Sequence, residues 1–135
     1  MAIQYSTAVR NAQLDALETA IGVSAVLKIR TGAAPANVAT ADSGTVLATM
    51  TLPSDWLAAA SAGAKAKSGT WQDSSANAAG TGGYFRIYDS AGSACHIQGT
   101  VTATGGGGDL TLDNTSIASG QSVTISSFTL TAANS

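Results

Sequence analysis

Apolar residues recur at every second position through most of the chain. The clearest run is SACHIQGTVTA at 93–103, where Cys95 and Ile97 alternate with His96 and Gln98. Because successive side chains of a strand point to opposite faces of a sheet, this spacing predicts half-buried strands. Runs of the same kind, separated by turn residues, occupy 23–30, 45–52, 67–72, 82–89, 109–113 and 121–132. They predict a mainly β fold, an antiparallel β-sandwich or jelly-roll-like domain.

The N-terminal stretch has helical spacing instead. In STAVRNAQLDALETAI, at 6–21, Leu14, Leu17 and Ile21 share one helix face. Ser6 is a suitable N-cap, and a glycine follows the last apolar residue, where helices commonly end. The stretch therefore predicts one N-terminal α-helix.

The length of 135 residues fits a single domain. We expect residues 1–22 to form a helix that packs on, or extends from, a β domain at 23–135. Within that domain, Ser54 can cap the alanine-rich segment that follows Pro53. This pattern predicts a short helical turn near 54–61.

Two features of the C-terminal half bear on strand connections. Val123 and Ile125 occupy odd positions, whereas Phe128 and Leu130 occupy even ones. A single strand that buries both pairs needs one extra residue, which predicts a β-bulge near 126–127.

Four consecutive glycines stand in TATGGGGDLTLDN, at 102–114. A phosphate-binding loop would need a helix after the glycines, and its Walker form a lysine, but here Asp109 and a strand follow. We therefore expect the tip of an antiparallel hairpin, mobile or ordered by a neighbouring subunit.

The charge content restricts the classes of partner. Only 10% of the residues are charged and the net charge is -2, which offers no electrostatic footprint for nucleic acid or an acidic membrane. The single cysteine excludes an internal disulfide framework. We expect no secretory signal and no membrane span, and folding in a reducing cytoplasm.

None of the usual reactive constellations is complete. Cys95 and His96 are adjacent, but neighbours in a strand project to opposite faces, so they do not form a nucleophile and its base. Asp109, Thr111 and Asp113 share one face and offer oxygen ligands for a hard cation, although solvated or turn-capping aspartates explain them better. The sequence therefore predicts no enzyme activity, no cofactor and no metal site.

Candidate core and contact residues follow from the strand faces. Tyr84, Arg86 and Tyr88 lie on the side of their strand opposite the core, and tyrosine and arginine are enriched in interface hot spots. With His96 they are the candidate interface; a second packed face, or contact with the helix, is the alternative for the three strand residues. The candidate core anchors are Trp56, Trp71, Phe85, Ile87 and Phe128.

Three stretches, STAVRNAQLDALETAIG, LPSDWLAAASAGAKAKSGTW and the C-terminal stretch from YFRIYDSAG to SSFTL, resemble small structural proteins of tailed bacteriophage virions. The resemblance is one of texture and short phrases over nearly the whole chain, without a catalytic motif. It implies a virion part, most like a capsid decoration or cement protein, assembled in the host bacterial cytoplasm. It also implies a homo-oligomer, a dimer or trimer, that binds the major capsid protein or other virion proteins.

Two alternatives to capsid decoration stay open: a structural part of the neck or tail, and a carbohydrate-binding module for host adhesion. The loops of a sandwich can gather at one end and carry such binding. The scarcity of aromatic residues, 5% of the chain, argues against a carbohydrate site.

Overall fold

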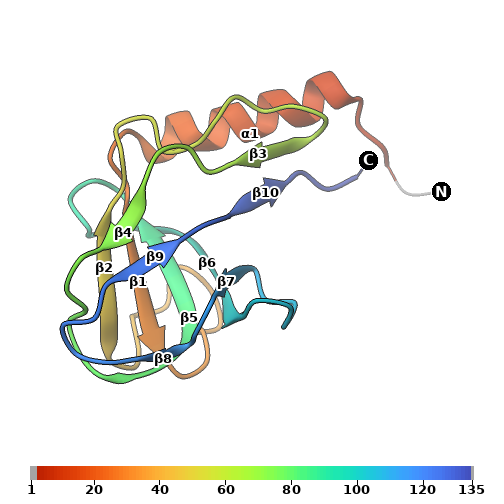
Figure 1. The fold of residues 1–135 in the computed structure, drawn as a ribbon. Helices are drawn as coiled ribbons and strands as arrows, with labels where there is room; N and C mark the ends of the chain where they lie inside the picture. The colour runs from red at the N-terminus through yellow and green to blue at the C-terminus, as the bar shows by residue number, and fades with distance from the viewer. Residues whose placement is uncertain (1–2, 135) are drawn as a thin grey trace.

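The computed structural model describes residues 3–134 and is mainly β, with one N-terminal helix (Figure 1). The elements are α1 (Thr7–Ile21), β1 (Val26–Thr31), β2 (Val46–Thr51), β3 (Ala64–Ala66), β4 (Trp71–Asp73), β5 (Gly80–Tyr88), β6 (Cys95–Ala103), β7 (Leu110–Leu112), β8 (Ser116–Ile117), β9 (Val123–Ile125) and β10 (Thr129–Thr131).

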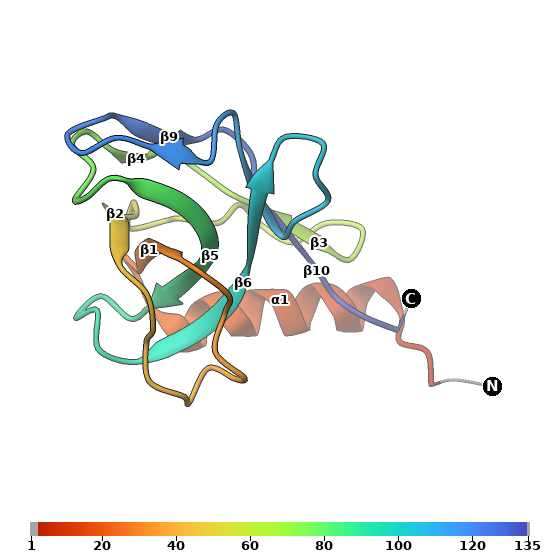
Figure 2. The same ribbon diagram turned by 90° about the horizontal axis from the view of Figure 1, so that it is seen from below.

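The helix forms where its sequence predicts it. The Ser6 hydroxyl accepts a hydrogen bond from the Val9 N–H at 3.2 Å, and Gly22 ends the helix with a φ of 94°. Leu14 and Ile21 are buried on its inner face. The helix runs across one end of the β structure and packs against β3 (Figures 1 and 2).

The principal sheet is curled and mixed, with strand order β2-β1-β5-β6-β7 and β8 beside the start of β5. All its pairs are antiparallel except β6 with β7, which are parallel. Two further two-stranded sheets, β10-β3 and β4-β9, accompany it. The predicted mainly β class is therefore confirmed, whereas the purely antiparallel sheet is not what the chain forms.

The core contains a chain of aromatic rings. The Trp71 ring lies 6.1 Å from that of Trp56 and 5.4 Å from that of Phe128, and Phe128 meets Phe85 edge to face at 5.6 Å between ring centroids. These four residues and Ile87 are all buried. The predicted core anchors are confirmed.

The helical turn predicted near 54–61 is wrong. This segment contains no helix, and it pairs with the chain within and just after β3 through bridges of Ser61 with Ala64 and of Leu57 with Lys67. Trp56 and Leu57 are both buried, and the indole N–H of Trp56 donates to the Gly22 carbonyl at 2.9 Å. Burial of these two neighbours and the cross-chain bonds outweigh the helix propensity of the alanines.

The predicted bulge near 126–127 is also wrong, although the change of phase is real. Val123, Ile125 and Phe128 are buried and Leu130 is half-buried. The chain accommodates both pairs by ending β9, which pairs with β4, and starting β10, which pairs with β3. Two strands in different sheets replace one bulged strand.

Candidate functional site: a slot between two strand edges

The predicted contact face on β5 lies inside the molecule. Tyr84, Arg86 and Tyr88 are at most 2% exposed, because the connection between β1 and β2 folds over them. Their role as an exposed interface is therefore corrected, and the alternative of a second packed face describes them. His96, the fourth candidate, is exposed.

A carboxylate in that connection organises the covered face. Asp42 accepts hydrogen bonds from Arg30 at 2.9 Å, from Arg86 at 2.7 Å and from the Tyr88 hydroxyl at 2.8 Å. Arg86 also donates to the Gln98 side-chain oxygen at 2.9 Å. These bonds hold the β1–β2 connection against the sheet.

The Asp42 cluster has the electrostatics of a structural site. Burial alone would raise the pKa of Asp42, but the bonds from Tyr88 and Arg86 and the charge of Arg30 hold that pKa below its usual value. Burial, and then the bond to Asp42, raise the pKa of Tyr88 to about 12. These shifts favour the carboxylate form of Asp42 and the protonated form of Tyr88, as hydrogen bonding between the two groups requires.

Sequence reasoning missed Asp42, although a signal was present. Arg30 and Arg86 stand at polar-face positions of strands that the structure shows to be neighbours. Two arginines packed on one covered face require a carboxylate, and Asp42 is the only acidic residue in the connection between β1 and β2.

The Cys95 and His96 side chains do not form a reactive pair. Cys95 is half-buried and His96 is exposed, as expected for neighbours on opposite faces of β6. Burial raises the pKa of the Cys95 thiol, which disfavours the thiolate needed for nucleophilic attack.

The Asp109 carboxylate is engaged in hydrogen bonds with Thr100. It accepts these bonds from the N–H of Thr100 at 2.9 Å and from its hydroxyl at 3.1 Å. Within residues 3–134, no three His, Cys, Asp or Glu side chains come together in a group that could hold a metal ion.

The four-glycine loop is not the tip of an antiparallel hairpin. It turns back along β6, so that β7 pairs with β6 in parallel through Val101 with Leu110. Parallel neighbours usually need a crossover of a dozen or more residues, but here residues 104–109 suffice. The backbone angle or the close surroundings of each glycine favour glycine at that position.

Gly105 and Gly107 have φ angles of 88° and 81°, which favour glycine. A Cβ at Gly106 or Gly108 would stand 2.8 Å from atoms of the Thr102 side chain. The Gly108 N–H also donates to the Thr102 hydroxyl at 3.0 Å. The loop thus packs on its own strand through Gly106 and Gly108, and the expectation of an antiparallel hairpin tip is corrected.

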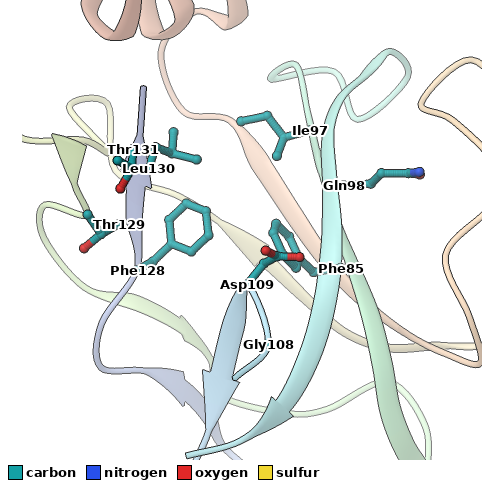
Figure 3. A pocket seen from close by; sticks show the side chains of 9 residues that line it. All are labelled: Phe85, Ile97, Gln98, Gly108, Asp109, Phe128, Thr129, Leu130 and Thr131. Carbon is teal, nitrogen blue, oxygen red and sulfur yellow. The ribbon is translucent and has the colours of Figure 1, made fainter. Parts of the chain in front are cut away.

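This loop leaves a slot between β6 and β10. The slot encloses about 500 Å³, and its lining residues are Phe85, Ile97, Gln98, Gly108, Asp109, Phe128, Thr129, Leu130 and Thr131. Figure 3 shows Ile97 and Leu130 on opposite sides of the slot, with Phe85 and Phe128 between them. The Gln98 side chain points away from it, toward the β1–β2 connection, so this residue lines the slot with its backbone.

Both long sides of the slot are strand edges. β7 pairs only with residues 101–103 of β6, and the Thr100 N–H donates a hydrogen bond to the Asp109 carboxylate. Because alternate residues present their backbone groups to the same edge, Gln98 presents its N–H and C=O to the slot. Within residues 3–134, no strand pairs with β6 at this point.

The β10 edge is open in the same way. The Phe128 carbonyl and the Ala132 N–H bond to the β3 side, at Lys67 and Gly63 respectively. The intervening Thr129 and Thr131 therefore present their backbone groups to the opposite edge, which faces the slot. No local pattern in the sequence indicates this juxtaposition, because β6 and β10 pair with different neighbours.

Searches against protein-family models, curated proteins and solved structures find no match to this chain. In the part of the chain that the structure describes, no helix is long and apolar enough to cross a membrane.

Proposed function

We propose that the chain is a non-enzymatic structural component of a tailed-phage virion that decorates or cements the capsid by bridging neighbouring subunits. The observation that carries the assembly role is the slot, where two strand edges face each other and no strand of the described residues lies between them. Unpaired edges are templates for strand addition from another chain. The capsid assignment rests on the resemblance to virion structural proteins.

The electrostatics of the described residues agree with an assembly role. The acidic and basic side chains that come together do so in ion pairs, Asp42 with two arginines and Lys65 with Asp15 and Glu18. A low-charge surface limits long-range repulsion between many copies packed on one particle. Many copies of a modest contact then give a large total stabilisation.

A carbohydrate-binding role has less support. Open sugar sites rely on exposed aromatic platforms, but among the aromatic residues only Tyr5 is substantially exposed, at 38%. The other aromatic side chains lie in the core or in the Asp42 cluster. A neck or tail position differs from a capsid position only in the partner, so the same experiment separates them.

The test is the composition of purified particles. Capsids, necks and tails separated from one particle preparation should contain the protein in the capsid fraction, in a fixed ratio to the major capsid protein on a denaturing gel. Purified protein added to particles that lack it should restore that ratio and raise their resistance to heat or chelator. A fixed ratio in the tail fraction alone would move the proposal to the tail, and absence from all fractions would overturn it.

A further inference from the structure

We infer that the slot between β6 and β10 binds, as an added strand, an extended segment of a different protein. This segment carries apolar residues at alternate positions and one lysine or arginine opposite Asp109. The inference rests on the proposed assembly role, because it names the chemistry of the partner segment that performs it. On the proposed function, the segment belongs to a neighbouring virion subunit.

The two long sides of the slot suit a peptide backbone. Gln98 on the β6 side, and Thr129 and Thr131 on the β10 side, present backbone N–H and C=O groups to it by the alternation along each strand. No strand of residues 3–134 pairs with either edge at this point. An extended chain offers donors and acceptors along both of its sides at once, so it satisfies both edges.

The size of the slot fits about three residues of such a strand. One strand residue occupies roughly 3.3 Å along the chain, roughly 4.8 Å between strands and roughly 10 Å between packed sheets, which gives about 160 Å³. The slot encloses about 500 Å³, and β10 is 3 residues long. The volume of the slot and the length of its open β10 edge therefore indicate the same short segment.

The lining determines which side chains the segment carries. Phe85 and Phe128 lie between the two strands, and Ile97 and Leu130 stand on opposite sides of the slot (Figure 3). Ile97 and Leu130 are only partly buried, so apolar side chains on an added strand would cover surface that solvent reaches in the free protein. Because alternate residues of a strand face the same side, the segment carries its apolar residues at every second position.

Asp109 adds a preference of charge. It is the only charged residue among those that line the slot, and it is exposed. Its Oδ2 accepts both bonds from Thr100, and its Oδ1 accepts none within residues 3–134. A lysine or arginine on the added strand can donate to Oδ1, whereas an acidic residue there would be repelled. Because the pair is exposed, it selects the register of the segment more than it adds affinity.

A second copy of this chain would have to break its own bonds to supply the segment. The N-terminal residues are held by the bond of the Tyr5 N–H to the Asn134 carbonyl, the β1–β2 connection by Asp42, and the glycine loop by Thr102. The other long connections of the described chain make backbone bonds to neighbouring segments. The inference therefore names a different protein as the source of the strand.

The contact is small for one copy. Three strand residues bury far less than the roughly 800 Å² that each partner buries in a stable interface. An inserted segment therefore binds weakly in solution, and a particle holds the protein through many such contacts at once.

The direct test uses labelled peptides and fluorescence anisotropy. The probes are seven-residue peptides of alternating valine and threonine: the parent, and those in which one lysine replaces each threonine in turn. At least one of them should bind at least tenfold more tightly than the same peptide with N-methylated valines, which keeps its side chains but loses the donors along one edge. Equal affinity of every peptide and its N-methylated form would overturn strand addition at the slot.

Two substitutions at one position locate the binding. Thr131→Pro removes an N–H that faces the slot, whereas the bonds of Phe128 and Ala132 to the β3 side remain. Thr131→Val keeps the N–H. The proline variant should lose at least tenfold in affinity for the best peptide and the valine variant less than twofold, both with unchanged circular dichroism. If both variants bind as the natural chain does, the β10 edge is not the site and the inference falls.

The lysine scan tests the role of Asp109. One register should be favoured at least threefold, and Asp109→Asn should remove that preference while it still binds the parent peptide. Asp113→Asn, also at an exposed position, is the matched control and should keep the preference. A preference that persists in Asp109→Asn would overturn the pairing of charges.

Failure of this inference is distinguishable from failure of the proposed function. If Thr131→Pro and Thr131→Val bind particles equally well and in a fixed ratio, the slot contact falls and the capsid role stands. If the peptides bind but no particle fraction contains the protein, the slot contact stands and the virion role falls. If sedimentation velocity shows an oligomer that Thr131→Pro dissolves and Thr131→Val retains, a second copy fills the slot, and the assignment to a different protein falls.

Discussion

Arg86 donates a hydrogen bond to Asp42 at 2.7 Å, where the arginine side chain is 2% exposed and the carboxylate 32%. The aspartate comes from the β1–β2 connection and the arginine from the middle of the sheet, so this pair joins a long surface segment to the domain. It also places Arg86 against Gln98, whose backbone forms one edge of the slot. The buried network therefore supports the strand that forms one edge of the slot.

Replacement of Asp42 by asparagine should destabilise the fold. The change leaves Arg30 and Arg86 without a counter-charge on a covered face, and we expect a loss of about 2–3 kcal/mol in the free energy of unfolding, less than for a fully buried pair because Asp42 is partly solvated. Urea denaturation measures the loss. Asp55→Asn, at an exposed position, should change stability by about 0.5 kcal/mol or less. Equal effects of the two changes would contradict a structural role for the cluster.

Acid should weaken the same cluster. The pKa of folded Asp42 lies below the unfolded value of 3.8, so its bonds contribute full stability above that value and lose it as the pH falls through the folded pKa. Stability measured from about pH 6 down to about pH 2 should therefore fall less steeply in Asp42→Asn than in the natural chain. Parallel curves would show that Asp42 is not held in its charged form. Asp15 and Asp89, whose pKa values are lowered by bonds from Lys65 and from the Ser93 backbone, supply the acid dependence that remains.

Alkali should act through Tyr88. Its folded pKa of about 12 exceeds the ordinary 10.0, so the folded chain keeps the proton that the unfolded chain releases, and stability declines as the pH rises from about 10 toward 12. Tyr88→Phe should cost about 1 kcal/mol at neutral pH, from the lost bond to Asp42, and should flatten the alkaline decline. A pH titration of phenolate absorbance checks this, with Tyr5→Phe as the exposed control. If stability declined as steeply at alkaline pH in Tyr88→Phe as in the natural chain, Tyr88 would not be the cause of the decline.

The glycine loop should be intolerant of a single methyl group. Gly108→Ala places a Cβ 2.8 Å from the Thr102 side chain and 3.0 Å from its backbone nitrogen, and we expect a loss of about 1–3 kcal/mol. Gly92→Ala is the comparison, because its Cβ meets open space and only its φ of 71° opposes a side chain, at about 1 kcal/mol. A freely mobile loop would accept Gly108→Ala without loss, which thermal denaturation would reveal.

Much of the fold follows from local pattern. The cap at Ser6 and the positive φ of Gly22 define the ends of α1, and period-two spacing locates β1, β2, β5 and β6 to within a few residues. The tryptophans are buried as their size predicts. These features depend on neighbours in sequence, so the sequence alone carries them.

The features that local pattern missed depend on distant partners. The segment at 54–61 has helix-forming alanines, but the indole of Trp56 is hydrogen-bonded to the Gly22 carbonyl. Leu57 and Ser61 form bridges with Lys67 and Ala64, respectively. The parallel β6–β7 pair depends on how closely the glycines approach Thr102. The slot depends on the change of partner between β9, which pairs with β4, and β10, which pairs with β3. The sequence pattern predicts an outer contact face for Tyr84, Arg86 and Tyr88, because the β1–β2 connection has no periodicity that would indicate that it covers them.

Hydrogen exchange at the backbone amides of Gln98, Thr129 and Thr131 tests most directly whether assembly closes the slot. By the alternation of backbone groups along a strand these amides face the slot, where no strand of residues 3–134 pairs with either edge. At dilutions where light scattering shows a monomer, they should exchange rapidly. In protein bound to particles, an added strand should slow their exchange by at least tenfold, while the amides already bonded within β5 stay unchanged. Equal exchange in the free and assembled protein would contradict strand addition at the slot.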